Sequence, residues 1–292
     1  MTKPGMNRRK EEKRKMKAET EGTVRYEVTN GIACITMNKP ENGNCINRMM
    51  TEPLFQAFSR AEADEEVKVV ILRGNGRTFC TGGDVRRMSG LEGARNRHDE
   101  VRASGQAVRK IMTMEKPVIC GVQGFVAGAG LGLMLACDLV VCQTSTRFMT
   151  AFSNVGLASD CGAAYMLAKI LGKQKAKELL FFSDIMTAQE MYELGLVNKI
   201  VADASLEEEV EAMAARLLDR PRFATALIKN LVNRSDEMSL ESSLLYEESL
   251  QAMLMDSEDF REGTGAFLEK RKPVFGGQGA TSDEKAGNGE TE

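Results

Sequence analysis

The chain has 292 residues, with 39 Lys and Arg against 42 Asp and Glu, so its formal charge is −3. Hydrophobic residues make up 42% and charged residues 28%, which excludes a disordered or fibrous protein. The near-neutral balance gives no global reason to bind nucleic acid. The longest stretch without charged or strongly polar side chains, Gly124 to Cys137, is shorter than the roughly 20 residues of a membrane helix. We therefore expect neither a nucleic-acid nor a membrane partner.

The single histidine, His98, limits the chemistry open to this chain. One histidine cannot form a multi-His metal site, and His98 stands in a charged run typical of a solvated helix face. The seven cysteines lie mostly in apolar strings without a Cys-x-x-Cys pair, which is typical of reduced thiols in a cytosolic compartment. We expect no metal, a cytoplasmic location, and catalysis by carboxylates, hydroxyls or backbone amides.

The first half of the chain alternates short β-branched runs with helical patterns. We expect strands at Val24–Val28, Ile32–Met37, Val67–Leu72, Val118–Val122 and Leu139–Cys142, and helices at Met49–Ala63, Arg102–Met114 and from about Ala129. Strands and helices that alternate at this spacing favour an α/β fold with a largely parallel sheet.

From Gly162 onward the patterns are mainly helical. We expect helices at Ala163–Leu171, Lys173–Phe182, Ala188–Leu194, Leu206–Leu218 and onward to about Lys270, with one strand at Val197–Val201. The ends differ in composition, being basic and nearly devoid of apolar residues at the start and glycine-rich and acidic at the finish. We divide the chain into a disordered basic tail (1–22), a core (23–204), a C-terminal helical region (205–275) and a disordered acidic tail (276–292).

Two glycine-rich turns follow buried strands, one at Phe79–Val85 and one at Gly124–Gly132. Glycine lets a backbone approach a ligand closely and point its N–H groups at it. Two amides from separate turns can together hold an oxygen that becomes negative during a reaction. Taken singly, each turn is better explained as a tight turn with helix-packing glycines. The second turn also lacks the spacing of a dinucleotide-binding motif.

These turns belong to an ordered series of motifs. The series contains Asn38-Lys39-Pro40 with Asn44 and Asn47, Phe79 to Asp84, Lys116-Pro117-Val118, Gly124 to Gly132 with Cys137-Asp138, Thr187 to Glu190 before Gly195-Leu196-Val197, and Ala266 to Phe275. With these motifs in this order, the chain resembles the enoyl-CoA hydratase/isomerase (crotonase) superfamily from about Gly22 to Phe275. The resemblance implies a spiral of ββα turns with a C-terminal helical trimerisation region, a homotrimer or hexamer, and an acyl-CoA thioester as substrate without a further cofactor.

The resemblance also implies roles for residues of the two turns. The oxyanion amides are expected at Gly83 and Ala129, where alanine replaces a usual glycine. Gly82, Asp84 and Gly128 are expected to contact the substrate. Arg86 falls where the family often places a basic residue near the CoA nucleotide, although a plain surface arginine explains it equally well.

The chain departs from the hydratases of this family at two positions. Those enzymes use two glutamates, and the matching residues here are Gly132 and Phe152. Neither residue can hold and deprotonate a water molecule, so ordinary hydration is disfavoured. We expect Phe152 in an apolar substrate-binding wall, an expectation compatible with its being a core aromatic residue.

A different acid is available at Asp160. The segment Val155–Asp160 resembles the one that carries the working carboxylate in dienoyl-CoA isomerases. Asp160 also precedes a predicted helix, where an N-cap role would contribute about 0.5–2 kcal/mol. With the two glycine turns and Phe152 nearby, we favour catalysis. Asp160 is expected to take the proton at C2 of a 3-enoyl thioester and return it at C4 through an oxyanion-stabilised enolate.

Other reactions of the same family stay open, hydration among them. The 3-hydroxyisobutyryl-CoA hydrolases share the Gly-Gly-Asp-Val turn and the aspartate but carry a glutamate at the position of Phe152. The 4-chlorobenzoyl-CoA dehalogenases use the aspartate as a nucleophile and a histidine where this chain has Gly105. A scaffold that binds acyl-CoA without catalysis is the non-enzyme alternative. The acyl chain length depends on the segment Met88–Arg97, which the sequence does not place.

Overall fold

The computed structural model describes residues 22–276, which fall into two compact units that divide between Leu218 and Asp219. The predicted tails, 1–22 and 276–292, lie outside the described residues apart from Gly22 and Gly276.

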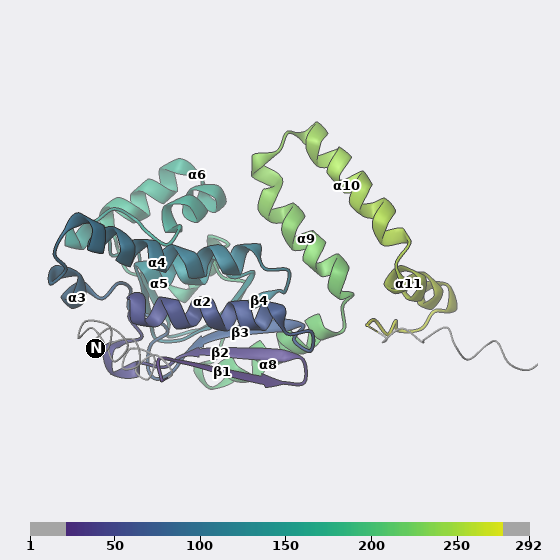
Figure 1. The fold of residues 1–292 in the computed structure, drawn as a ribbon, viewed down its shortest axis with the longest axis horizontal. Coiled ribbons are helices and arrows are strands. Elements are labelled where there is room, and N and C mark those ends of the chain that lie inside the picture. Colours follow the sequence, from purple (N-terminus) through teal and green to yellow (C-terminus); the bar gives the residue numbers. More distant parts are fainter. Residues whose placement is uncertain (1–21, 277–292) are drawn as a thin grey trace, which may run out of the picture. The chain divides into compact units, whose positions relative to one another are not determined.

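The first unit is built on a six-stranded sheet in the order β1-β2-β3-β4-β6-β9 (Figure 1). The strands are Val24–Thr29, Ile32–Met37, Val69–Gly74, Val118–Val122, Leu139–Gln143 and Lys199–Val201. β1 and β2 are antiparallel, and they meet at Asn30 and Gly31, whose positive φ angles suit a two-residue hairpin turn. All the other neighbouring pairs are parallel, so the predicted α/β class with a largely parallel sheet is confirmed.

Helices cover both faces of this sheet (Figure 1). Alternate residues of β3 point to opposite faces of the sheet. Val70 and Leu72 pack with α2 (Arg48–Ala63) and α4 (Ala94–Thr113) on one face. Val69 and Ile71 pack with α8 (Leu206–Leu218) on the other face. We expected the helical region to begin at residue 205. The first unit instead includes α8, because its apolar face is buried against the sheet.

A second, three-stranded sheet holds β5 (Phe125–Ala127), β7 (Arg147–Met149) and β8 (Met186–Thr187). The remaining helices of this unit are α3 (Val85–Ser89), α5 (Ala129–Leu135), α6 (Ala163–Phe182) and α7 (Ala188–Glu193). The two helices predicted at Ala163–Leu171 and Lys173–Phe182 are confirmed: they are the two halves of α6, which is interrupted at Gly172 by a non-helical φ of 77° and ψ of 164°. Single 3-10 turns occur at Pro40–Asn42, Ser153–Val155, Asp203–Ser205 and Ser235–Glu237.

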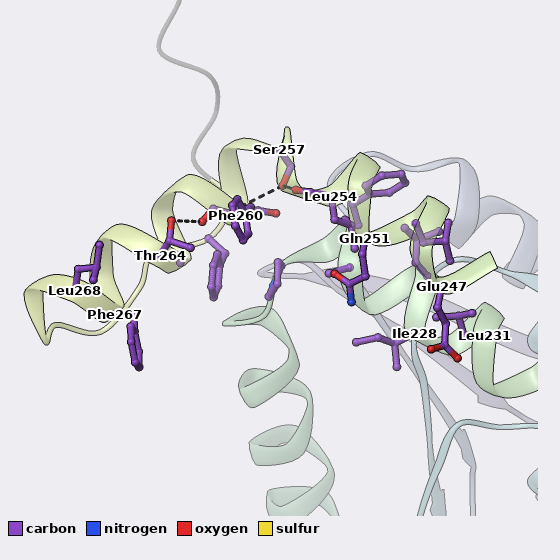
Figure 2. Close-up of a pocket in the computed structure, with 18 residues that line it drawn as sticks. Ile228, Leu231, Glu247, Gln251, Leu254, Ser257, Phe260, Thr264, Phe267 and Leu268 are labelled. Atoms are coloured by element: carbon purple, nitrogen blue, oxygen red, sulfur yellow. Dashed lines mark hydrogen bonds between the residues drawn. The ribbon is translucent and has the colours of Figure 1, made fainter. Parts of the chain in front are cut away.

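The second unit contains α9 (Arg222–Arg234), α10 (Leu240–Met255) and α11 (Glu258–Glu269). Side chains of all three helices line an apolar cavity of about 540 Å³, among them Ile228, Leu254 and Phe260 (Figure 2). Its polar contacts are local: Ser257 donates to the carbonyl of Leu254 at 2.6 Å and accepts from the N–H of Phe260 at 3.1 Å. Among residues 22–276, no helix is long and apolar enough to cross a membrane.

A buried asparagine, Asn44, fixes the chain below the first glycine turn. Its Oδ1 accepts the N–H of Lys39 at 2.8 Å. Its Nδ2 lies 2.9 Å from the carbonyl of Asn75, 3.0 Å from that of Thr78 and 3.2 Å from that of Phe79. Its φ of 55° lies in the left-handed region, which asparagine tolerates better than most residues. Asn44 therefore ties the turn after β2 to the segment that leads into the glycine turn.

We expect Asn44→Ala to lower the free energy of unfolding by about 2–4 kcal/mol. The change leaves buried carbonyl and N–H groups without partners and forces alanine into the left-handed region. Urea denaturation measures the effect. Exposed Asn42 gives a matched control, because Asn42→Ala should stay within about 0.5 kcal/mol of the wild type. A loss below about 1 kcal/mol for Asn44→Ala would contradict the anchoring role.

Candidate active site

The first glycine turn is held by backbone hydrogen bonds on both edges. On one side, the N–H of Ile46 donates to Gly82 at 2.7 Å and the N–H of Asp84 donates to Ile46 at 2.9 Å. On the other side, the N–H of Ala127 donates to Cys80 at 3.0 Å. Because Gly82 and Asp84 make the bonds to Ile46, the amide of the intervening Gly83 points away from it. Within residues 22–276 the Gly83 N–H has no backbone acceptor.

The second glycine turn packs directly against the first. Gly128 has φ 49° and ψ −121°, a conformation suited to glycine, and α5 starts at the next residue. A methyl group on Gly82 would lie 2.9 Å from the carbonyl oxygen of Ala127 and 3.6 Å from the Cα of Gly128. Ala129 opens α5, and its N–H has no backbone acceptor in the described part of the chain. Gly83 and Ala129 thus directly follow the two glycines in contact, Gly82 and Gly128, and their N–H groups are available to bind an acceptor from a substrate.

Phe152 lies against the second turn. Its side chain is buried, and its Cε1 is 3.8 Å from the position that a Cβ on Gly128 would take. Its carbonyl accepts the N–H groups of Val155 at 3.2 Å and Leu157 at 3.0 Å, which fixes the loop that follows. The position that carries a glutamate in hydratases therefore presents an aromatic ring beside the turn.

Asp160 carries a buried oxygen without a partner. Its Oδ1 has no hydrogen-bond partner among the described residues. Burial raises the pKa of this carboxyl group above its usual 3.8, and the adjacent Cys161 thiol and a backbone N–H offset only part of that rise. A buried polar atom left unpaired is costly and rare, and carboxyl groups of this kind concentrate at functional sites.

The alternative that Asp160 caps the following helix is wrong. The N-cap of α6 is Gly162, which has no side chain to make a capping hydrogen bond. The hydroxyl of Ser159 accepts the N–H of Ala164 at 2.9 Å, whereas Asp160 contributes only its backbone carbonyl, to the N–H of Ala163 at 3.0 Å. The carboxyl group of Asp160 is therefore left for another purpose.

Cys161 connects Asp160 to the second turn. A methyl group on Gly132 would lie 2.6 Å from the carbonyl oxygen of Cys161, so the backbone of Cys161 packs against α5. Gly132 is three residues beyond Ala129, and residues at this spacing are neighbours on one face of a helix. Asp160 is thereby held next to the helix that begins with the Ala129 amide.

An apolar cavity of about 400 Å³ adjoins the first turn. It is lined by Val85, Met88, Ser89, Leu91, Arg97, Glu100, Val101, Val155 and Leu157. The sulfur of Met88 lies 3.3 Å from where a Cβ on Gly83 would be, which places one wall of the cavity at the turn. Val155 and Leu157 belong to the loop between Phe152 and Asp160. The segment Met88–Arg97, on which acyl chain length is expected to depend, contributes four lining residues.

Two of the expected substrate contacts have other surroundings. Asp84 caps α3 by accepting the N–H of Arg87 at 3.0 Å, and its other oxygen accepts from Asn47 at 3.0 Å. This bonding holds α3 beside the cavity. Arg86 is exposed, does not line the cavity and makes no ion pair within residues 22–276.

The sequence pattern did not indicate Cys161, Ser104 or the wall built by α3. Cys161 faces both the Asp160 carboxyl and the Ser104 hydroxyl, and burial raises the pKa of its thiol. Only its place next to Asp160 could have singled it out, because one cysteine among seven carries no distinctive pattern. α3 has only five residues, too few for a helical periodicity to show.

His98 lies on an exposed face of α4, as predicted. All seven cysteines are free, and all but Cys34 are buried. No cluster of His, Cys, Asp or Glu that could hold a metal ion occurs in the described part of the chain.

Known proteins are similar to this chain in both sequence and fold. The sequence model described as enoyl-CoA hydratase/isomerase matches residues 27–278. The 1,2-epoxyphenylacetyl-CoA isomerase of Escherichia coli is 34% identical over 86% of this chain and 97% of its own. The crotonyl-CoA hydratase of Syntrophomonas wolfei is 32% identical over 84% and 94%. The crystal structure of an enoyl-CoA hydratase from Polaromonas sp. JS666 superposes with a TM-score of 0.84 at 31% identity, covering 87% of this chain and 99% of that one. The chain therefore belongs to the enoyl-CoA hydratase/isomerase (crotonase) family.

Proposed function

We propose that this protein is an acyl-CoA isomerase. It shifts a double bond from the 3- to the 2-position of an enoyl-CoA, or moves a proton equivalently in a dienoyl or ring substrate, with Asp160 as its single acid and base. The observation that carries the proposal is the buried, unpartnered Oδ1 of Asp160 next to α5. The thioester itself supplies the acidity of C2, so the reaction needs no further cofactor.

The mechanism follows from the acidity of a thioester. Removal of the C2 proton by Asp160 leaves a dienolate, whose negative charge rests on the thioester oxygen. The amides of Gly83 and Ala129 donate to that oxygen, and donors of this kind contribute about 3–4 kcal/mol each. Asp160 then returns the same proton at C4, which leaves a double bond between C2 and C3 and restores the carbonyl. The raised pKa of Asp160 favours the removal of the C2 proton, because it makes the carboxylate a stronger base than an exposed aspartate.

Hydration is the second candidate, because relatives of similar identity include both an isomerase and a hydratase. Addition of water requires a group that holds and deprotonates the water molecule. The two positions that supply such groups in hydratases hold Gly132 and Phe152, and the loop after Phe152 adds apolar walls to the cavity. We therefore rank isomerisation first.

Asp160→Asn should lower the rate of double-bond isomerisation by about 10²–10⁴-fold and change acyl-CoA affinity by less than about threefold. The amide keeps the shape of the side chain but cannot accept a proton from C2. Mass spectrometry and NMR of products from 3-enoyl-, 2-enoyl- and 3-hydroxyacyl-CoA esters measure the activity, and calorimetry measures binding. Rapid hydration of 2-enoyl-CoA by the wild type would contradict the isomerase assignment. A wild type that binds these esters and converts none would instead establish a non-catalytic scaffold.

Activity and stability should respond to pH in opposite directions. Asp160 must be ionised to act as a base, so kcat/KM should fall as the pH drops through its raised pKa, with a midpoint above 3.8. The folded state holds this proton more tightly than the unfolded state. Its contribution to stability is therefore complete below the unfolded pKa and is lost as the pH rises through the folded pKa. Asp160→Asn should accordingly raise the melting temperature at pH 8 and lose that advantage below about pH 4. A lower melting temperature at pH 8 would contradict the cost of burial.

We further propose that the protein is a homo-oligomer, a trimer or hexamer, whose subunits associate through α9–α11. This unit exposes many large apolar side chains, with Phe267 81% and Leu268 79% exposed. Extensive apolar surface of this kind marks an interaction site rather than a free surface. A second copy of the chain is the partner that is always present.

Phe267→Glu should shift the protein from an oligomer to a monomer in sedimentation velocity runs at micromolar concentration. A charge at this exposed position cannot be buried in a subunit contact without a large desolvation cost. Glu258→Gln, an exposed polar change on the same helix, should leave the oligomer intact. A monomeric wild type would contradict the proposal.

We also propose a cytoplasmic location, because seven free cysteines suit a reducing compartment.

A further inference from the structure

The contact between Gly132 of α5 and Cys161 leaves no room for a side chain at position 132. A methyl group on Gly132 would lie 2.6 Å from the carbonyl oxygen, 3.1 Å from the carbonyl carbon and 2.8 Å from the Cβ of Cys161. Two of these atoms are backbone and the third is attached to it, so none can rotate away. Any residue other than glycine at position 132 therefore requires the backbones of α5 and the segment 160–161 to move apart.

The same segment is held in an unusual conformation. Cys161 has a φ of 48°, in the left-handed region that a non-glycine residue rarely adopts. Such conformations persist only where the surroundings enforce them. Cys161 is surrounded by Gly132, which has no side chain, by the hydroxyl of Ser104 and by the thiol of Cys80.

This geometry determines where Asp160 lies. Cys161 contacts α5 one turn after Ala129, which corresponds to about 4.5 Å along the helix axis. Asp160 directly precedes Cys161, and its Oδ1 is enclosed by protein. We expect a shift of Cys161 away from Gly132 to move Asp160 relative to the Ala129 amide and to expose its carboxyl group to water.

We infer that Gly132 is a positioning residue for Asp160, and that a bare glycine at this place excludes a second acid from the site. The inference rests on the proposed function of Asp160 and extends it. Hydratases of the family carry a glutamate at the position of Gly132. In this chain that glutamate and a docked Asp160 cannot coexist, so the contact that places the isomerisation acid also prevents a hydration acid.

The first experiment is Gly132→Ala. We expect kcat for the 3-enoyl-CoA shift to fall at least tenfold with KM changed less than about threefold, because displacement by a fraction of an ångström misplaces the base. The matched control is Gly265→Ala, the same change in α11 at a position with no atom closer than 4.0 Å, which should keep wild-type kinetics. A folded Gly132→Ala protein with wild-type kcat would overturn the inference.

A pair of variants at Cys161 keeps the test decisive if Gly132→Ala does not fold. Both Cys161→Ala and Cys161→Gly remove the thiol that faces Asp160, but alanine retains the constrained backbone whereas glycine accepts the same φ and frees the backbone. We therefore expect kcat of Cys161→Gly to be about tenfold below kcat of Cys161→Ala. Equal kcat values for the two variants would overturn the inference.

A readout other than activity separates this inference from the proposed function. The pKa of Asp160, followed by ¹³C NMR of its carboxyl carbon, should fall toward the ordinary value in Gly132→Ala, since water regains access. The titratable groups that face this carboxyl within the first unit are the thiols of Cys161 and, through it, Cys80. If the wild type shifts no double bond but this pKa falls, the proposed function fails and the positioning role stands. An unchanged pKa in a folded Gly132→Ala protein would overturn the positioning role even if the wild type is an isomerase.

The exclusion of a second acid has its own test. The double variant Gly132→Glu with Phe152→Glu restores both hydratase glutamates. It should hydrate crotonyl-CoA no faster than Phe152→Glu alone, because the glutamate at position 132 displaces the segment 160–161 instead of entering the site. A rate tenfold above that of the single variant would overturn the exclusion.

Discussion

The backbone of residues 79–84 is hydrogen-bonded on both edges, and the candidate site depends on this constraint. On one side lie residues 43–46, and on the other lie residues 123–127. A segment fixed on two edges cannot shift without breaking bonds to both neighbours. Because Gly82 then meets the backbone of the second turn, two stretches far apart in the sequence present available amides next to each other. Rigid placement of such donors is what makes them effective toward a developing negative charge.

The placement of Asp160 opposes stability, and the sheet compensates for it. An aspartate with an unpaired buried oxygen destabilises the ionised form of the folded chain. The first unit can tolerate this cost because its sheet is covered on both faces, with β3 alone burying Val69, Val70, Ile71 and Leu72. Groups that are costly to the fold and well placed for proton transfer are typical of active sites, where stability and activity compete.

The sequence predicted those parts of the molecule whose physics is local. Val118–Val122 was predicted with the observed bounds, because a short apolar run that follows a proline is typical of a buried strand. α4 begins eight residues before the predicted Arg102, since its first turns are charged and exposed and lack apolar periodicity. The role of Gly132 could be seen only as a missing glutamate. The reason for the glycine is a contact with Cys161, 29 positions away, and no local pattern records such a contact.

The apolar cavity and the single acid support the same chemistry. An enolate in contact with water would take its proton from solvent, whereas an enolate between apolar walls can take it only from the acid that removed it. Met88, Val155 and Leu157 provide such walls beside the first turn, and Val155 and Leu157 belong to the loop that leads to Asp160 in the sequence. Within a site of this kind, one carboxyl group suffices for a reaction that neither consumes nor releases a proton. A hydratase needs a second polar group to hold its water, and an aromatic ring at position 152 works against that requirement.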